Sequence, residues 1–165
     1  MSEDQTPRLG LPLLHIGQAG KEWTHNEALA RLDIVVAGMV EDIGVDVPPA
    51  DPKPGQCWIV GAQPGGEWVG QAGAIAGWTD GGWRFVVPTP GLSLWCAARA
   101  RRVTFHDAWE DGVVRAARVI VDGVPVIGAR QPAISSPAGG ATIDAEARDT
   151  VAAVLAAMRA HGLIA

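Results

Sequence analysis

Apolar positions over residues 24–46 recur at the spacing of an amphipathic helix. They follow one another at steps of three and four: Leu29, Leu32, Val36, Met39 and Ile43. Thr24 and Glu27 at its start form a capping box, in which each side chain can satisfy the backbone amide of the other residue. The apolar stripe lasts for only two heptads, so packing on the protein's own core is favoured over a coiled-coil seam between subunits.

The segments on either side of this helix are irregular. Residues 1–23 form an apolar arm that glycine and proline interrupt. Such an arm is typical of a segment that lies against its own domain or against a neighbouring subunit. Residues 47–55 form a stiff, proline-rich linker.

Residues 56–128 alternate short apolar runs with turn residues, which is the pattern of a Trp- and Gly-rich β-domain. The candidate strands are QCWIVG, EWVG, GAIAGW, GWRFVVP, LSLWCAA, RVTFHDAW, VVRAARVIV and VPVIG. Asp-Gly pairs suited to type I′ hairpin turns lie between apolar flanks, at Asp80-Gly81, Asp111-Gly112 and Asp122-Gly123. Pro125 has no amide hydrogen, which places its strand at a sheet edge. We expect a small antiparallel β-sandwich or barrel.

A second linker, residues 129–142, precedes a C-terminal helix over 143–162. Acidic side chains fall in its first turn and basic ones in its last, as the helix dipole prefers: Asp144, Glu146, Arg159 and His161. Its apolar stripe is thin and consists of Val151, Val154, Leu155 and Met158. A helix with so little apolar surface must dock to be stable in water, so we expect this stripe to mediate oligomerisation. The predicted fold class is α+β, mainly β, with a helix on each side of the β-domain.

The stretch GWTDGGW suggests a ligand platform. With a two-residue turn, Trp78 faces Trp83 and Thr79 faces Gly82, so both indoles lie on one side of the hairpin. Trp68 also follows glycine residues, in GGEWVG. Trp68, Trp78 and Trp83 are therefore candidates for stacking against the rings of a glycan. Residue type alone favours indoles as the core of a small sheet, and the pair can serve both purposes.

Composition narrows the possible functions. The chain has 165 residues, of which 48% are hydrophobic, with seven Trp, no Tyr and two Phe. A net charge of −5 argues against a sequence-independent grip on nucleic acid. The longest apolar run, residues 34–40, is too short to cross a bilayer, and no secretion signal is evident. We therefore expect a protein made in the cytoplasm, without membrane insertion. Cys57 and Cys96 lack the spacing of metal ligands, and buried thiols are favoured over a disulfide bridge.

The sequence contains no motif for phosphate, dinucleotide, zinc or nucleophilic chemistry. Its densest acid–base cluster is FHDAWED, which holds His106, Asp107, Glu110 and Asp111. This cluster could supply a hydrolytic carboxylate pair or a cation site, but acids gather at turns for turn chemistry alone, so a solvated loop is favoured. RARR, residues 99–102, is interpreted as a salt-bridged or edge-guarding strand. We expect a protein that is not an enzyme and has no catalytic residue, cofactor or metal.

LGLPLLHIGQAGKEWTHNEALARLD, GQCWIV and GGEWVGQAGAIAGWTDGGWRFVVPTPG resemble a domain-of-unknown-function family whose members occur in tailed phages and gene transfer agents of alphaproteobacteria. The ending GGATIDAEARDTVAAVLAAMRAHGLI is similar to the short helical tail of many such virion proteins. The resemblance implies a structural virion protein, a head spike or fibre that touches the host surface and binds capsular polysaccharide. It also implies other virion proteins as partners, a homo-oligomer that is commonly a trimer, and release of the particle by lysis. The family carries no established catalytic residues.

Two alternatives accompany this interpretation. The protein could be a structural adaptor that joins a capsid or baseplate to another fibre and binds no glycan. It could also be an enzyme that acts on the polysaccharide, a hypothesis that depends only on the FHDAWED cluster.

Overall fold

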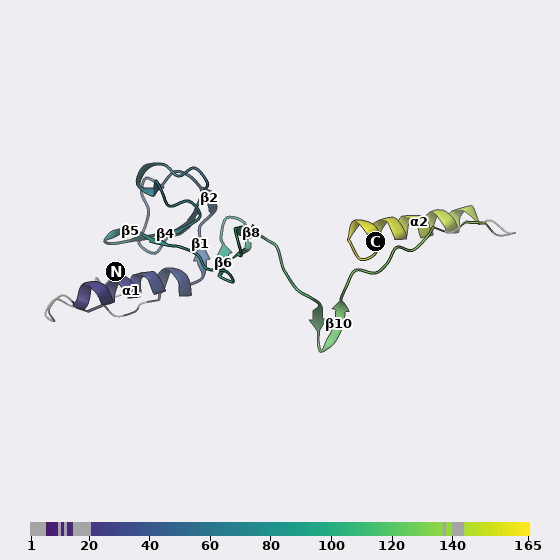
Figure 1. Ribbon diagram of the computed structural model, residues 1–165, viewed down its shortest axis with the longest axis horizontal. Coiled ribbons are helices and arrows are strands. Elements are labelled where there is room, and N and C mark those ends of the chain that lie inside the picture. The colour runs from purple at the N-terminus through teal and green to yellow at the C-terminus, as the bar shows by residue number, and fades with distance from the viewer. Residues whose placement is uncertain (1–5, 10, 12, 15–20, 137, 140–143) are drawn as a thin grey trace. The chain divides into compact units, whose positions relative to one another are not determined.

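The computed structural model describes residues 6–9, 11, 13–14, 21–136, 138–139 and 144–165 (Figure 1). The chain forms two compact units, Met1–Val113 and Val114–Ala165. Within the described ranges, an N-terminal helix, three small β-sheets and a C-terminal helix give an α+β fold that is mainly β, as the sequence predicts. None of the described helices is both long and apolar enough to span a membrane.

Helix α1 begins before the predicted capping residue Thr24 and ends well before residue 46, since it covers Lys21–Val36. Gly38, with a φ of +63°, turns the backbone away from the helical path. The residues that follow form two short strands, β1 Met39–Val40 and β2 Ile43–Val45. The helix prediction is wrong over 37–46 because the backbone there pairs with strands far along the chain, and this pairing outweighs the local helical spacing.

Two four-stranded sheets build the first unit, one with the order β2-β3-β4-β5 and the other with the order β1-β6-β7-β8. Their remaining strands are β3 Cys57–Val60, β4 Ile75–Thr79, β5 Gly82–Val86, β6 Ser93–Cys96, β7 Arg101–Phe105 and β8 Trp109–Asp111. β1 pairs in parallel with β6, and β2 pairs in parallel with β3, whereas the other pairs of these sheets are antiparallel. The antiparallel prediction is therefore wrong for the two edge strands. They enter from α1 instead of from a hairpin, so no tight turn imposes the antiparallel direction.

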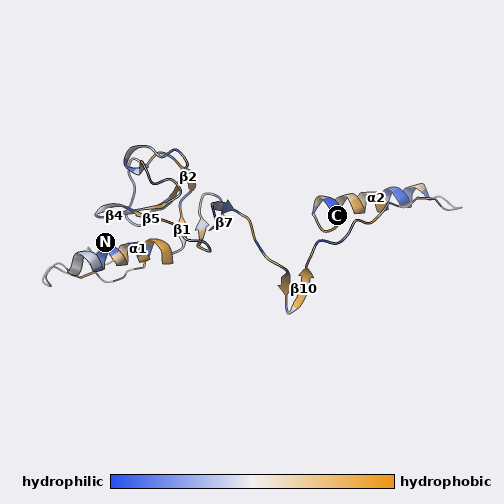
Figure 2. Ribbon diagram, viewed as in Figure 1, coloured by the Kyte–Doolittle hydropathy of each residue, from blue (hydrophilic) through white to orange (hydrophobic). Residues whose placement is uncertain are grey.

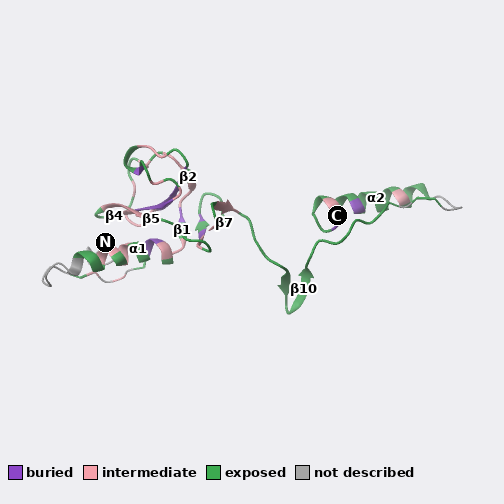
Figure 3. Ribbon diagram, in the orientation of Figure 1, coloured by how far each residue is buried: buried purple, intermediate pink, exposed green. Residues whose placement is uncertain are grey.

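The β2-β3-β4-β5 sheet is buried on both faces, and all four residues of β3 are buried (buried residues are purple in Figure 3). One face shares a core with α1 and the other sheet: Ile34, Val40, Cys57, Ile59, Ile75, Leu94, Cys96 and Val103. The opposite face forms a second core, which the loop between β3 and β4 completes: Trp58, Val60, Trp68 and Ala76. That loop contains the 3-10 turn η1, Gly66–Trp68, where the sequence predicts the strand EWVG.

The described residues at the start of the N-terminal arm, 6–9, lie against their own unit, one of the two alternatives that the sequence leaves open. Asp33 of α1 is 2% exposed and accepts hydrogen bonds from the Thr6 hydroxyl and from two arm amides, at distances of 2.6 to 3.1 Å. The Arg8 guanidinium donates to the backbone carbonyls of Ile34 and Met39, at 3.0 and 2.6 Å. A buried carboxylate on the helix thus holds the arm in place.

The second unit contains a hairpin and a helix: β9 Val119–Val121, β10 Val124–Ile127 and α2 Ala145–Ala160. Asp122 and Gly123 have φ angles of +48° and +79°, so the predicted type I′ turn is confirmed at this pair. Asp144 caps α2, because its side chain accepts a hydrogen bond from the Ala147 amide at 2.9 Å. Since this unit begins at Val114, the predicted β-domain of residues 56–128 divides between the two units.

The α2 stripe predicted to mediate oligomerisation is partly used inside the second unit. Leu155 is buried, and so is Ile164 beyond the helix. Val151 and Val154 are 46% and 53% exposed, and Met158 is half-buried. The role of this stripe in oligomerisation stays a prediction.

Glycine at position 77 allows α1 to rest directly on β4. A Cβ there would lie 2.5 Å from Cδ1 of Ile34, closer than packed side chains approach. We expect Gly77→Ala to lower the free energy of unfolding by about 1–3 kcal/mol through overpacking, measured by urea denaturation. Gly128→Ala is the matched control, because a Cβ there meets nothing within 4 Å and should not destabilise the protein. An unaffected Gly77→Ala variant would contradict this close contact.

We expect Asp33→Ala to lower the free energy of unfolding by about 1–3 kcal/mol, because the buried Thr6 hydroxyl and two arm amides lose their acceptor. The arm should then also become a site of proteolysis, visible as N-terminal trimming by a protease. Asp51→Ala is the control, since the Asp51 side chain is 84% exposed and its pair with Lys53 lies at the surface. This control should change stability by less than about 1 kcal/mol, and equal effects of the two variants would refute the role of Asp33.

Candidate ligand-binding site

The β4–β5 hairpin has the predicted register, with Trp78 opposite Trp83 and Thr79 opposite Gly82. Its turn is not of type I′, because the positive φ, +93°, falls on Gly82 and not on the Asp80-Gly81 pair. The Thr79 hydroxyl closes the turn by donating to the carbonyl oxygen of Gly82 at 2.8 Å. The turn-type prediction is wrong here because a third residue, Gly82, accepts the left-handed conformation without steric cost.

The indoles predicted as a glycan platform lie in a packed cluster. The ring centroids of Trp78 and Trp83 are 4.9 Å apart at an interplanar angle of 69°, and those of Trp68 and Trp83 are 5.0 Å apart at 84°. In each of these edge-to-face contacts, the edge of one indole covers one face of the other. Trp68 is completely buried and presents no face to a ligand, whereas Trp78 and Trp83 are half-buried. Trp68 belongs to the second core and Trp83 packs against it, whereas a ligand-binding role for Trp78 and Trp83 stays a prediction.

A different hollow, which we call the arm cleft, lies between the arm, α1 and the β4–β5 turn. Its volume is about 360 Å³, within the range of small-ligand sites, and its walls include Trp23, Asn26, Glu27, Thr79, Asp80 and Arg84. The Trp23 side chain is 77% exposed, more than any other tryptophan of the chain. The cleft therefore combines a free indole with carboxylate, amide and guanidinium groups. The sequence pattern does not single out Trp23, because its exposure depends on the path of the arm.

Ion pairs fix the polar wall of the arm cleft. Arg84 Nε lies 2.6 Å from the Glu27 carboxylate, and Arg31 Nε lies 2.9 Å from it. Burial raises the pKa of Glu27, but the hydrogen bonds from Arg31 and Arg84 outweigh it and hold that pKa below its usual range. Arg84 also donates to the carbonyl oxygen of Gly81 at 3.1 Å, next to the exposed Asp80 side chain. Charged groups of this wall are thus oriented before any ligand arrives.

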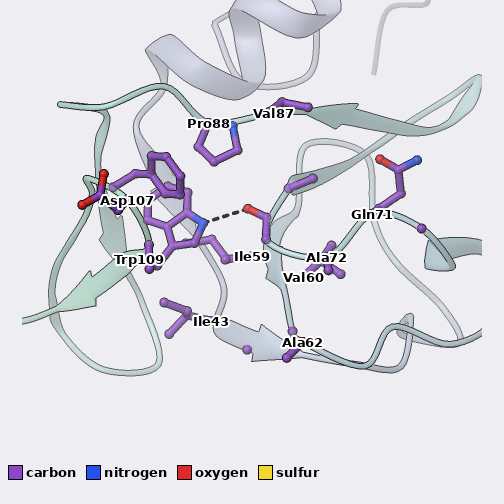
Figure 4. Close-up of a pocket in the computed structure, with 17 residues that line it drawn as sticks. Ile43, Ile59, Val60, Ala62, Gln71, Ala72, Val87, Pro88, Asp107 and Trp109 are labelled. Carbon is purple, nitrogen blue, oxygen red and sulfur yellow. Dashed lines mark hydrogen bonds between the residues drawn. The ribbon is translucent and has the colours of Figure 1, made fainter.

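A larger pocket of about 580 Å³ opens between the two sheets of the first unit (Figure 4). Trp109 Nε1 donates to the carbonyl oxygen of Gly73 across its base at 2.8 Å, and this bond connects β8 to the loop after η1. Asp107 and Gln71 are the polar side chains on its wall, and the rest of the lining is apolar or glycine. Among the described residues that line this pocket, Asp107 is the single charged one.

The side chains of the FHDAWED segment make two separate sets of contacts. Asp111 ends β8 and pairs with Arg99 Nη1 at 2.7 Å and Arg101 Nε at 2.6 Å, so the interpretation of RARR as a salt-bridged segment is confirmed. His106 Nε2 lies 3.6 Å from the Glu110 carboxylate. Nowhere in the described residues do three His, Cys, Asp or Glu side chains gather in a way that could hold a metal ion. Asp111-Gly112 also forms no hairpin turn, because the chain leaves the sheet after β8.

Both cysteines are buried and free, so the structure has thiols where the sequence leaves a bridge possible. Burial raises the pKa of Cys57 to about 11, against the smaller opposing effect of the nearby Arg8 guanidinium. The thiol therefore stays protonated at neutral pH.

A sequence model of the DUF2793 family, described as a protein of unknown function, matches residues 25–110, more than half of the chain. The chain belongs to this family. The matched residues run from α1 to β8 and lie entirely within the first unit. They include most of the residues that line the arm cleft. No curated protein matches the chain. The family description names no activity, so it transfers no residue roles to the cleft.

The Asp111 ion pairs should make stability depend on acid pH. Hydrogen bonds from Arg101 and Arg99 hold the pKa of Asp111 far below its usual range, so the unfolded chain binds this proton more readily than the folded chain. The stabilisation is complete above the unfolded pKa of about 4 and is lost as the pH falls toward the folded value. We expect Asp111→Asn to be less stable than the wild type at pH 7 in low salt, with the difference shrinking below about pH 4, measured by urea denaturation. A difference that does not change with pH would contradict the ion pairs.

Proposed function

We propose that the protein is a structural virion component of a phage-like particle, of the gene transfer agent type, and that it binds capsular polysaccharide on the host surface. The quoted N-terminal and central motifs support this through their resemblance to virion proteins of that kind. In this proposal the protein is assembled into particles in the cytoplasm, is released by lysis, and acts as a homo-oligomeric head spike or fibre component beside other virion proteins.

The observation that carries glycan binding is the exposed Trp23 indole in the arm cleft. Sugar rings present flat faces of C–H groups that pack on an indole, and hydroxyl groups that need fixed polar partners. Trp23 offers the first kind of contact, and Asp80 together with the Glu27–Arg84 pair offers the second. This assignment moves the stacking role from Trp68, Trp78 and Trp83, predicted from sequence, to a ring with a free face.

The carboxylates of the cleft favour binding over hydrolysis. A glycosidase needs one carboxylic acid whose pKa is raised so that it can protonate the leaving group. The Glu27 pKa is lowered, so its carboxylate is ionised near neutral pH and suits hydroxyl recognition. We therefore propose an adhesin that is not an enzyme and needs no metal or cofactor.

We expect Trp23→Ala to weaken binding to a host capsular polysaccharide by about tenfold, equivalent to about 1.4 kcal/mol. The measurement is biolayer interferometry of the full chain on an array of alphaproteobacterial capsular polysaccharides. Trp95→Ala is the matched control, because Trp95 is also exposed, at 43%, but does not line the cleft. No binding to any polysaccharide, or equal losses for the two variants, would remove the cleft from the proposal.

A structural adaptor without a glycan site is the second candidate. It is favoured by the apolar surface of the second unit, where Val151, Val154 and both strands of the hairpin are exposed. If the protein is an adaptor, particles from a deletion strain should also lack a second protein, and the purified chain should not bind glycans. Mass spectrometry of purified particles with and without the gene distinguishes the two candidates.

A further inference from the structure

The β9–β10 hairpin consists largely of apolar residues that are exposed to solvent (orange in Figure 2 and green in Figure 3). Its apolar positions are between 40% and 61% exposed: Val119, Ile120, Val121, Val124, Val126 and Ile127. An isolated two-stranded hairpin is marginally stable in water, and a third strand or a packing partner is needed to hold it. Among the described strands, only β9 and β10 form this sheet, so both of its edges lack a neighbour.

The two edges of the hairpin differ in their capacity to accept another strand. In a hairpin with a two-residue type I′ turn, the closing pair Val121–Val124 exchanges its hydrogen bonds inside the hairpin, and the next pair, Ile120–Pro125, directs its backbone groups outward. Pro125 has no N–H to offer, so the β10 edge is blocked at that point. Ile120 retains both its N–H and its C=O on the β9 edge.

The β9 segment is complementary to itself in the antiparallel direction. Its sequence from 118 to 122 is Arg-Val-Ile-Val-Asp. When two copies pair about a two-fold axis at Ile120, the two Ile120 residues exchange hydrogen bonds and Val119 lies opposite Val121 of the other copy. Asp122 is the turn residue that directly follows β9, so Arg118 of one copy then lies beside the Asp122 turn of the other copy, twice in each pair. Both side chains are exposed, and neither has an ion-pair partner in the described part of the chain.

We propose that two copies of this chain pair through the outer edges of their β9 strands, centred on Ile120, in one four-stranded antiparallel sheet of order β10-β9-β9-β10. β9 is the pairing strand because its outer edge has free backbone groups. Pro125 prevents a further strand from adding to β10 on either side of the sheet. The Arg118–Asp122 contacts determine the register. Cross-strand pairs of opposite charge stabilise such a ladder, and like charges oppose it. The pairing narrows the proposed homo-oligomer to even numbers of subunits and replaces the threefold assembly that the resemblance implies. It does not depend on glycan binding, so a negative polysaccharide result leaves it intact.

Charge reversal on the full chain tests the register. Sedimentation equilibrium should show a dimer for the wild type and a dimer at least about tenfold weaker for Arg118→Asp and for Asp122→Lys, because each places like charges opposite one another. The double variant Arg118→Asp with Asp122→Lys restores opposite charges and should recover much of the affinity. All seven tryptophans precede residue 114, so an unchanged fluorescence spectrum shows that the first unit of each variant is folded.

Cross-linking tests the position of the two-fold axis. Opposite residues of a hydrogen-bonded antiparallel pair have Cα atoms about 5.5 Å apart, a separation that a disulfide can bridge. Ile120→Cys should therefore form a covalent dimer under mild oxidation, while Cys57 and Cys96 are buried and contribute little. Val114→Cys is the control, because Val114 is 85% exposed but lies outside the paired segment.

Several results would overturn the pairing. These are a wild type that is monomeric at all concentrations, a trimer, a dimer that is unaffected by both single charge reversals, or equal cross-linking of the two cysteine variants. A dimer that both single charge reversals leave unaffected would point to α2 or to another surface as the interface.

Discussion

The structure of the first unit depends on burying the β2-β3-β4-β5 sheet on both faces. β3 carries Cys, Trp, Ile and Val in succession, and the alternation of a strand sends two of these side chains to each face. Neither face is stable in water, since burial of one large apolar side chain contributes about 1.5–3 kcal/mol. The other sheet and α1 cover one face, and the loop with Trp68 covers the other. Two residues make this covering possible. Gly77 allows α1 to approach the sheet closely, and Asp33 binds the arm to α1.

Features that depend on neighbouring residues could be predicted from the sequence. The opposition of Trp78 and Trp83 follows from a two-residue turn, and the Asp122-Gly123 turn follows from the backbone preferences of that pair. The segment from Met39 to Val45 could not be predicted in the same way. Its spacing fits a helix, and its partners lie at 57–60 and 93–96, so the sequence near it holds no information about the pairing that determines its structure.

The same distinction explains why the candidate site was only partly predictable. Residue types identify indoles as possible glycan-stacking groups, but the exposure of each indole depends on the segments that pack over it. The loop between β3 and β4 brings Trp68 into the second core, where it also contacts Trp83. Trp23 keeps a free face beside an arm held by Asp33, and a single aspartate inside a helix gives no sequence signal for such an anchor. Rules on residue composition therefore find the aromatic chemistry and miss its location.

The two units gain their stability in different ways, and this difference connects their proposed roles. The core of the first unit closes within one chain, whereas the apolar residues of the β9–β10 hairpin are exposed within its own chain. In the proposed dimer, the stability of that hairpin depends on protein concentration, because association stabilises it. The stability of the first unit does not depend on concentration in this way. In the proposed dimer, each copy has one arm cleft in its first unit. If both proposals hold, joining two copies raises the effective concentration of the second cleft near a repetitive polysaccharide, and two weak sites together give stronger attachment than one.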